Sequence, residues 1–574
     1  MTKADLRELD LLQTLLIEYL SEFDLGLQVL TRILEIQLLD CKREEHPDVG
    51  TTLNKMARVF VKEAKYDKAM ELYKKSLAIR KKALGEGHPD VAQTMNDMAT
   101  VLSRRGKYDK AMSLFDKALA IRRNTLADDH PDVSQTLNNM ALVWNKQGKY
   151  DKAMGLYEKA LAIRKKALGK DHPRVGRTLN NMATVYENQG NYTKAMEVYE
   201  EALAIRKKAL GEDHPDVGTT MNNMGVVLEK EGEYKNAMSF FDKALALRKK
   251  ALGDDHLQVG TTLNNMALVW QRQGKYDKAM ELYEKALAIR KKALGEEHPH
   301  VGTTLNNMAR VLEKEAKYDK AMELYKKSLA IRKKALGEGH PDVGQTMNNM
   351  ATVLSRQGKY DKAMSLFDKA LAVRRNTLGD DHPEVGTTLN NMALVCDKQG
   401  KYDKAMKLYE KALAIRKEAL GEDHPYVGTT LNYMATVVAN QGNLIKAMEV
   451  YQEALAIRKK ALGEDHPDVG TTLNNMGVVL EKQGEYIKAM DLYEEALALR
   501  KKVLGADHLQ VGTTLNNMGV VLEKQGEYNK AMELYEKALA IRKKALGEEH
   551  PYVRTTSKRM SFVLEKRASL RDLE

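Results

Sequence analysis

Cysteine is nearly absent from this sequence, which contains two among 574 residues. Cys41 and Cys396 lie far apart in unrelated contexts, so they do not form the framework of a disulfide-stabilised protein. This usage predicts a reducing compartment, which we interpret as the cytoplasm. No apolar run reaches the roughly 18 residues of a membrane span, so we expect no membrane association. The N-terminal stretch mixes acidic residues with apolar ones and has no small-residue cleavage site, so we predict no signal peptide.

Signatures of catalysis are missing as well. The sequence has no phosphate-binding loop, nucleophile elbow, HExxH motif or set of kinase motifs. Its carboxylates recur at the same places along the chain, and no pair of them stands apart as an acid and base couple. We therefore predict that the protein is not an enzyme and that it needs no cofactor.

Proline is scarce, and its placement reveals how the chain is organised. All eleven prolines directly follow a histidine, and every histidine except His300 lies on a grid of 42 residues that runs from His46 to His550. A period of this length is typical of helical solenoids. Metal binding by the histidines is disfavoured, because neighbouring helices pack about 8–10 Å apart and zinc needs each nitrogen at about 2 Å. We interpret them as residues that begin helices.

Each unit of 42 residues predicts a helical hairpin. In the unit that begins at His256, one helical stripe of apolar residues covers 259–270 and a second covers 276–294. Gly274 separates the stripes and Gly295 follows them, which suits a left-handed position at a helix end. A single hairpin cannot bury its stripe, so neighbouring units must stack. Alanine replaces one of these glycines at three positions, Ala64, Ala127 and Ala316, so glycine is not strictly required there.

The fold class that follows is all-α, a right-handed superhelical solenoid of antiparallel helix hairpins. Residues 1–45 are predicted to form degenerate N-terminal capping helices. Twelve units fill residues 46–549, and residues 550–574 are predicted to form a C-terminal capping helix and tail.

A longer repeat lies on top of the short one, because residues 46–297 align without a gap on residues 298–549, six units each. The register holds across the junction without a linker, so we expect one superhelix. We infer a recent duplication, which makes sameness among units weak evidence of function.

The charge of the chain, +12 with a pI of about 9.1, raises the question of nucleic acid. The positive residues are spread evenly over the units, and most lie in the last turn of the second helix, as at Arg80, Lys81 and Lys82. Cations at that place complement the negative end of a helix. We interpret most of the charge as structural.

The apolar frame of the unit matches that of tetratricopeptide repeats: Leu263, Met266, Ala267 and Trp270 in the first helix, and Ala279, Tyr283 and Ala286 in the second. The longer pattern ALAIRKKALGxxHPDVGTTLNNMA resembles the repeats of kinesin light chains and of nephrocystin-like proteins. The resemblance covers residues 23 to 567, whereas the segment before it lacks the sustained heptads by which kinesin light chains bind the motor heavy chain. It implies a scaffold that binds peptides in a concave groove lined by the first helix of each hairpin.

Two sets of residues carry over to that groove. The eighth residue after each grid histidine is always asparagine, whose amide suits an extended peptide backbone or, alternatively, a bond to the neighbouring second helix. These residues are Asn54, Asn96, Asn138, Asn180, Asn222, Asn264, Asn306, Asn348, Asn390, Asn432, Asn474 and Asn516.

The sixteenth residue, two helical turns further on, is basic in ten units and either binds an acidic partner or is a solvated cation at the helix end. The basic residues are Lys62, Arg104, Lys146, Lys230, Arg272, Lys314, Arg356, Lys398, Lys482 and Lys524.

The partner predicted from these sets is an acidic protein or peptide, whose carboxylates would face the basic positions. The duplicated block further suggests a bivalent partner that presents two copies of its motif. The alternative is a nucleic-acid-binding helical repeat. It is disfavoured because such proteins read bases with side chains that vary between repeats, and here the asparagine does not vary.

Overall fold

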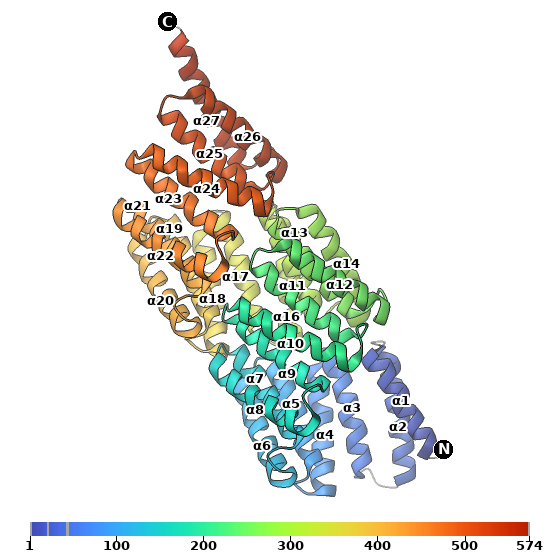
Figure 1. Ribbon diagram of the computed structural model, residues 1–574. Coiled ribbons are helices and arrows are strands. Elements are labelled where there is room, and N and C mark those ends of the chain that lie inside the picture. Colours follow the sequence, from blue (N-terminus) through green and yellow to red (C-terminus); the bar gives the residue numbers. More distant parts are fainter. Residues whose placement is uncertain (1–2, 20–21, 42–44, 572–574) are drawn as a thin grey trace.

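A computed structural model describes residues 3–19, 22–41 and 45–571 of the chain, and all regular structure in these residues is helical (Figure 1). Helix α1 (Lys3–Thr14), a π-helical turn (Leu15–Tyr19) and helix α2 (Phe23–Cys41) precede the repeats. Each repeat then consists of helix A, of 16 or 17 residues, and helix B, of 19 residues. A last helix, α27 (Pro551–Arg571), follows the twelfth repeat.

The twelve hairpins, in chain order, are α3 (Pro47–Lys62) and α4 (Tyr66–Leu84), α5 (Pro89–Arg104) and α6 (Tyr108–Leu126), α7 (Pro131–Lys146) and α8 (Tyr150–Leu168), α9 (Pro173–Asn188) and α10 (Tyr192–Leu210), α11 (Pro215–Lys230) and α12 (Tyr234–Leu252), α13 (Leu257–Arg272) and α14 (Tyr276–Leu294), α15 (Pro299–Lys314) and α16 (Tyr318–Leu336), α17 (Pro341–Arg356) and α18 (Tyr360–Leu378), α19 (Pro383–Lys398) and α20 (Tyr402–Leu420), α21 (Pro425–Asn440) and α22 (Leu444–Leu462), α23 (Pro467–Gln483) and α24 (Tyr486–Leu504), and α25 (Leu509–Lys524) and α26 (Tyr528–Leu546). We refer to them as repeats 1 to 12.

The histidine at the start of each helix A caps that helix. Its Nδ1 accepts a hydrogen bond of 3.0–3.3 Å from the backbone N–H two residues later, in all twelve repeats and again at His550. The proline that follows occupies the first helical turn, where its missing N–H leaves no acceptor unpaired. The prediction that these histidines begin helices is confirmed.

The two glycines of a repeat have different backbone conformations. Gly274, between helices A and B, has a φ of 71°, but Gly295, after helix B, combines a φ of 82° with a ψ of 163°. The second conformation is extended rather than left-handed helical, so the sequence-based expectation was wrong for this position. It is a region that L-residues rarely occupy, and Ala127 occupies it with a φ of 73° and a ψ of 161°.

We predict that Ala127→Gly stabilises the protein by about 1 kcal/mol, because it relieves this backbone strain. The duplicated position is Gly379, with a φ of 98° and a ψ of 162°. The reverse change, Gly379→Ala, should destabilise by a similar amount in the same urea-unfolding assay. Changes of the same sign at both positions would contradict the strain interpretation.

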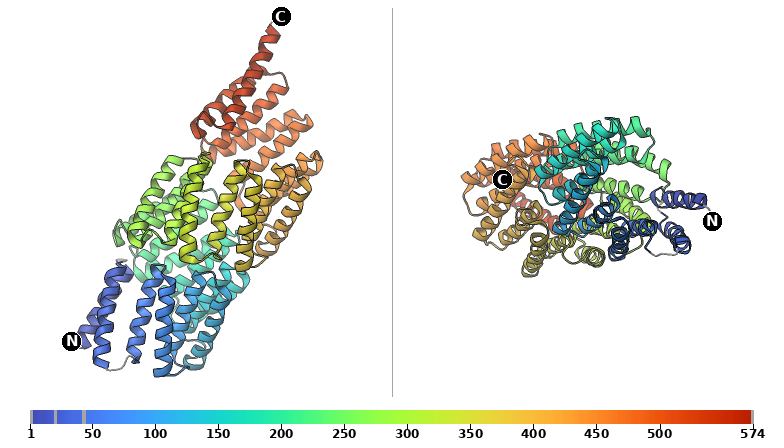
Figure 2. Two further views of the ribbon diagram at one scale, coloured as in Figure 1. Left: turned by 180° about the vertical axis from the view of Figure 1, so that it is seen from behind. Right: turned by 90° about the horizontal axis from the view of Figure 1, so that it is seen from below.

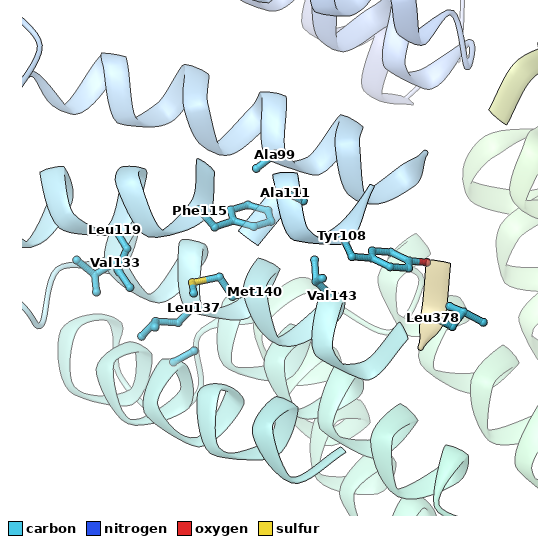
Figure 3. Packing of buried hydrophobic residues seen from close by; sticks show 11 residues of the cluster. Ala99, Tyr108, Ala111, Phe115, Leu119, Val133, Leu137, Met140, Val143 and Leu378 are labelled. Atoms are coloured by element: carbon cyan, nitrogen blue, oxygen red, sulfur yellow. The ribbon is translucent and has the colours of Figure 1, made fainter. Parts of the chain in front are cut away.

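The core is continuous along the solenoid, because each hairpin buries small and large residues against the next. In α14, for example, Ala279, Tyr283 and Ala286 have no exposed surface. The small alanines let helices A and B approach, and the tyrosine ring fills the space between successive repeats. Figure 3 shows one such cluster, in which Phe115 of α6 packs with Leu137 and Met140 of α7.

A buried arginine of helix B links three successive helices in eleven of the twelve repeats, and in the other repeat Arg206 bonds to α11 alone within the described part of the chain. Arg332 of α16 is 4% exposed, and its Nη1 donates to the Asp342 carbonyl oxygen (3.0 Å) and to Thr346 Oγ1 (2.8 Å) in α17. Its Nη2 donates to Thr303 Oγ1 (3.2 Å) in α15. We predicted from the sequence that this arginine is a cation at a helix end. That prediction was wrong, because the guanidinium donates hydrogen bonds to buried acceptors in the neighbouring helices.

The lysines next to that arginine do behave as helix-end cations. Lys208 pairs with Asp171 in the preceding loop at 2.6 Å, and Lys250 pairs with Asp213 at the same distance. Both lysines are more than two-thirds exposed, so these ion pairs contribute little to stability. Lysines at this position account for much of the positive charge of the chain, so that charge does not require a nucleic acid or another external partner to explain it.

Six repeats bring the chain once around the superhelix axis, so that repeat 7 lies over repeat 1 (Figures 1 and 2). The evidence is a set of hydrogen bonds between residues 236 positions apart. The ring of His298 bonds to the backbone oxygen of Lys62, His382 to that of Lys146, and His466 to that of Lys230, each at 3.2 Å. The histidine Nδ1 already accepts the capping bond, so Nε2 carries the proton and donates.

The other three histidines of the second turn repeat this contact. His340, His424 and His508 bond to the backbone of Arg104, Asn188 and Arg272. Each acceptor is the last residue of a first-turn helix A. The duplicated block of six repeats therefore corresponds to one superhelical turn, and each repeat lies over its own duplicate.

Candidate functional site

The interior of the superhelix holds a cavity of about 1590 Å³ where the two turns meet. Its walls come from the C-terminal halves of first-turn A helices, including Leu142 and Lys146 of α7, and from the N-terminal halves of second-turn A helices, including Thr303 of α15 and Thr387 of α19. The A helices thus line a shared channel. Neither six-repeat block forms this cavity alone.

Positive charge dominates the walls of this cavity. Its lining includes Lys62, Arg104, Lys146, Lys230, Arg310, Lys314 and Arg374, against four carboxylates, Glu187, Glu313, Asp342 and Glu384. Although solvent reaches the Lys314 amine, desolvation by the protein around it and the nearby Arg356 guanidinium lower its pKa to about 8. An anion bound in the channel would lie near several cations and would offset the repulsion between them.

The invariant asparagines lie mostly between helices, although Asn348 also lines the cavity. All twelve are 1–7% exposed. In most repeats the side-chain oxygen of this asparagine accepts a hydrogen bond from the second asparagine of the next repeat. Asn307 donates to Asn264 (3.2 Å), for example, and Asn349 donates to Asn306 (3.1 Å). Asn516 also accepts from Arg542 of its own helix B at 3.1 Å. These contacts form a ladder that ties successive A helices together.

The residue after each invariant asparagine is also asparagine in nine of the twelve repeats, the exceptions being Lys55, Asp97 and Tyr433. This second asparagine reaches the cavity in three repeats. Asn139, Asn349 and Asn391 line it and are half-buried, while one amide hydrogen of each is used in the ladder. We did not predict a role for the second asparagine, because this position varies more between repeats than the first. That variation indicates a residue that is not held by packing and therefore lies at a surface.

Two departures from the second asparagine interrupt the ladder. Tyr433 stacks on Tyr409 and leaves the Asn390 side-chain oxygen without a partner. Asp97 cannot donate to Asn54, and burial raises the pKa of its carboxyl. The duplicate of Asp97 is Asn349, which makes the bond.

Five of the ten basic positions lie in first-turn A helices, which end at the turn junction, and five lie in second-turn A helices, of which Lys314 also lines the cavity. Several are paired with a glutamate of the preceding repeat: Lys230 with Glu187 (2.8 Å), Arg272 with Glu229 (2.8 Å), Arg356 with Glu313 (3.0 Å) and Lys524 with Glu481 (2.7 Å). The Lys62 amine donates to the Ile17 carbonyl oxygen. These glutamates were not predicted from the sequence, and they neutralise part of the charge of the ten basic residues.

The described residues contain no group of three or more histidine, cysteine, aspartate or glutamate side chains placed to hold a metal ion. Across the same residues, none of the helices has both the length and the apolar character needed to cross a bilayer. Cys396 is buried in α19, and the side chain of Cys41 lies outside the described residues.

Comparison with known families gives overlapping matches to the tetratricopeptide repeat over residues 48–334 and 342–568. The chain belongs to the tetratricopeptide repeat family. Membership supports a role as a protein-interaction scaffold, since proteins of this family are generally non-catalytic. No curated protein matches the sequence.

Solved structures similar to this tetratricopeptide repeat protein include one described as "Crystal structure of Podosopora anserina putative kinesin light chain nearly identical TPR-like repeats". It is 25% identical, with a TM-score of 0.30, and the match covers 36% of this chain and 97% of that one. Another is BtubC (BKLC) from P. vanneervenii, at 25% identity and a TM-score of 0.32, with 42% of this chain and 92% of that one covered.

Proposed function

We propose that the protein is a non-catalytic cytoplasmic scaffold that binds an extended acidic peptide segment in its interior channel. The observation that carries the proposal is the cavity at the turn junction, where cations outnumber carboxylates. Leu142 and Thr100 line the same cavity and add apolar contact surface beside the cations. A peptide that offers carboxylates and a free backbone matches this lining.

The residues proposed to contact the peptide are a revised set. The second asparagines Asn139, Asn349 and Asn391 offer their amides to the backbone, and Lys146 and Lys314 offer charge. The invariant first asparagines act indirectly, by fixing the A helices that carry these groups, except for Asn348, which also lines the channel. A change in Asn264, Asn306 or Asn348 is then expected to loosen the solenoid as well as the channel.

We predict that Lys146→Ala with Lys314→Ala weakens binding of an acidic peptide by about tenfold, because each lost charge contact in a partly desolvated site is worth about 0.5–1 kcal/mol. Fluorescence anisotropy with length-matched acidic and basic peptides measures the effect. The control variant, Lys159→Ala with Lys326→Ala, removes exposed lysines from the helix B surface of the same two repeats. Equal losses in both variants, or equal binding of both peptides, would contradict the channel assignment.

Two further measurements separate the alternatives. Calorimetry that gives one peptide per chain supports a single shared channel, whereas two per chain supports the bivalent arrangement suggested by the duplicated block. Binding of single-stranded RNA with a steep salt dependence, and none of acidic peptide, would favour the nucleic-acid alternative.

A further inference from the structure

The contact between the two turns joins two different edges of the superhelix. The histidine edge consists of the capping histidine, the proline after it and the last leucine of helix B. The glycine edge consists of the glycine after helix A and the first tyrosine of helix B. Both edges occur in both six-repeat blocks, because the blocks are duplicates.

Within one chain, the histidine edge of the second turn is packed tightly onto the glycine edge of the first. A Cβ added to Gly190 would lie 2.8 Å from His424 Cδ2 and 3.0 Å from Pro425 Cδ, so a side chain there would force the histidine to shift. Leu378 of the second turn lies in the same buried cluster as Tyr108 of the first, as Figure 3 shows. Lys149 and Asp381 add an ion pair across the contact.

The other two edges are uncovered in several repeats, although His256 at the start of repeat 6 is buried. On the second turn, a Cβ at Gly400, Gly442 or Gly484 would meet nothing within 4 Å, although their duplicates Gly148, Gly190 and Gly232 are all in contact. On the first turn, Pro131, Pro173 and Pro215 are half-exposed, whereas their duplicates Pro383, Pro425 and Pro467 are buried.

The same difference holds for the apolar residues of the two edges. Leu126 and Tyr360 are each partly exposed, while their duplicates Leu378 and Tyr108 are each 5% exposed. The free edges therefore expose apolar surface whose equivalent is buried where the two turns of the same chain pack together.

We propose that a second copy of this chain docks its free histidine edge onto the free glycine edge of the first copy and continues the superhelix head to tail. The buried contact within one chain is the template for this interface, since nearly the same residues stand on the free edges. Helix α27 takes the place of a thirteenth helix A and leaves the glycine edge of repeats 8 to 12 open. The two docking surfaces differ, so the association is heterologous and can extend beyond a dimer.

The proposal is tested with two edge variants in sedimentation velocity. Gly400→Arg, Gly442→Arg and Gly484→Arg together block the glycine edge, and Ala64 and Ala316 show that a Cβ is accepted at this backbone position. Pro131→Arg, Pro173→Arg and Pro215→Arg block the histidine edge, where Leu257 and Leu509 show that proline is dispensable. The control, Ser113→Arg, Ser239→Arg and Gln452→Arg, adds the same charge at exposed positions of helix B. Circular dichroism checks that all variants are folded.

We expect the wild-type chain and the control to form dimers and longer species with rising concentration, and each edge variant alone to stay monomeric. An equimolar mixture of the two edge variants should form dimers but nothing longer, since each contributes one intact edge. A wild-type chain that is monomeric at about 1 mM overturns the proposal. Oligomers that persist in both variants, or a mixture that does not associate, also overturn it. Peptide binding in the channel is independent of these outcomes.

Discussion

Replacing Arg332 with methionine should lower the free energy of unfolding by about 3 kcal/mol, the largest effect that we expect from a single side chain. The guanidinium is almost completely buried and donates to three acceptors in two neighbouring helices. Hydrogen bonds from a charged donor contribute about 1.5–3 kcal/mol each, and their loss leaves buried acceptors without a partner. Methionine keeps most of the volume, so a cavity adds little.

A lysine two residues further on provides the control for Arg332→Met. Lys334 pairs with Glu297, but its side chain is 66% exposed, so Lys334→Met should cost at most about 1 kcal/mol. Urea unfolding measures both, and hydrogen exchange should place the loss in α15, α16 and α17, because repeats interact mainly with their neighbours. Equal effects of the two substitutions would show that the arginine network contributes no more than a surface ion pair.

Acid should open the junction between the turns while leaving the body of each helix intact, because the proton enters at Nδ1 and removes only the capping acceptor. Burial lowers the pKa of His298 and of His424 to about 4, and it also lowers the pKa of His466. A histidine released from the junction titrates near 6.5. The released state therefore takes up protons first as the pH falls. The stability of the junction is complete above about pH 6.5 and is lost between pH 6.5 and 4, by roughly 3 kcal/mol for each histidine at about 4.

The charged groups around these histidines set how sharp the transition is. Next to His298 lie Arg104 and Arg290, and next to His424 lie Arg416 and Lys230, all of which oppose protonation. His508 faces the cations Arg500 and Lys314, which oppose its protonation. Three other second-turn histidines have mixed surroundings: Asp342, Lys146 and Arg332 for His340, Glu384, Asp381 and Arg374 for His382, and Asp468, Arg458 and Arg272 for His466. The carboxylates in this set favour the charged ring and broaden the transition.

Small-angle scattering at pH 7 and pH 4.5, with circular dichroism at each pH, measures the opening as a longer particle of unchanged helicity. The triple variant His298→Asn, His424→Asn and His466→Asn keeps a capping acceptor but lacks the reach to the other turn, so it should be open already at pH 7. Its control is the duplicated set His46→Asn, His172→Asn and His214→Asn, which should close normally. A wild-type particle whose dimensions do not change down to pH 4 would contradict the prediction.

Helix positions were predictable because each is encoded locally and twelve times. The grid histidine, the proline after it and the two glycines mark the ends of helices A and B, and the apolar stripes give the faces that stack. The tetratricopeptide fold follows from these signals alone. The error at Gly295 arose because a glycine pattern reveals a positive φ but not the ψ that accompanies it.

The interior site was only partly predictable. Lys146 and Lys314 line the interior cavity, but most of the invariant asparagines lie between helices, as Asn264 and Asn306 show. An asparagine that bonds another asparagine has the same sequence pattern as one that bonds a ligand. The partner lies 43 residues away, in the next repeat, and only the packing of successive A helices brings the two amides together.

The sequence by itself determined the hairpin, its period and its stacking, because these depend on neighbours within about one repeat. Only the tertiary structure decided that six repeats close one turn. His130 and His382 stand in nearly the same local sequence, yet His382 is 8% exposed and bonds Lys146, whereas 39% of the His130 side chain is exposed. The difference comes from the small rotation between successive hairpins, which adds up over a whole turn before it places one repeat over another.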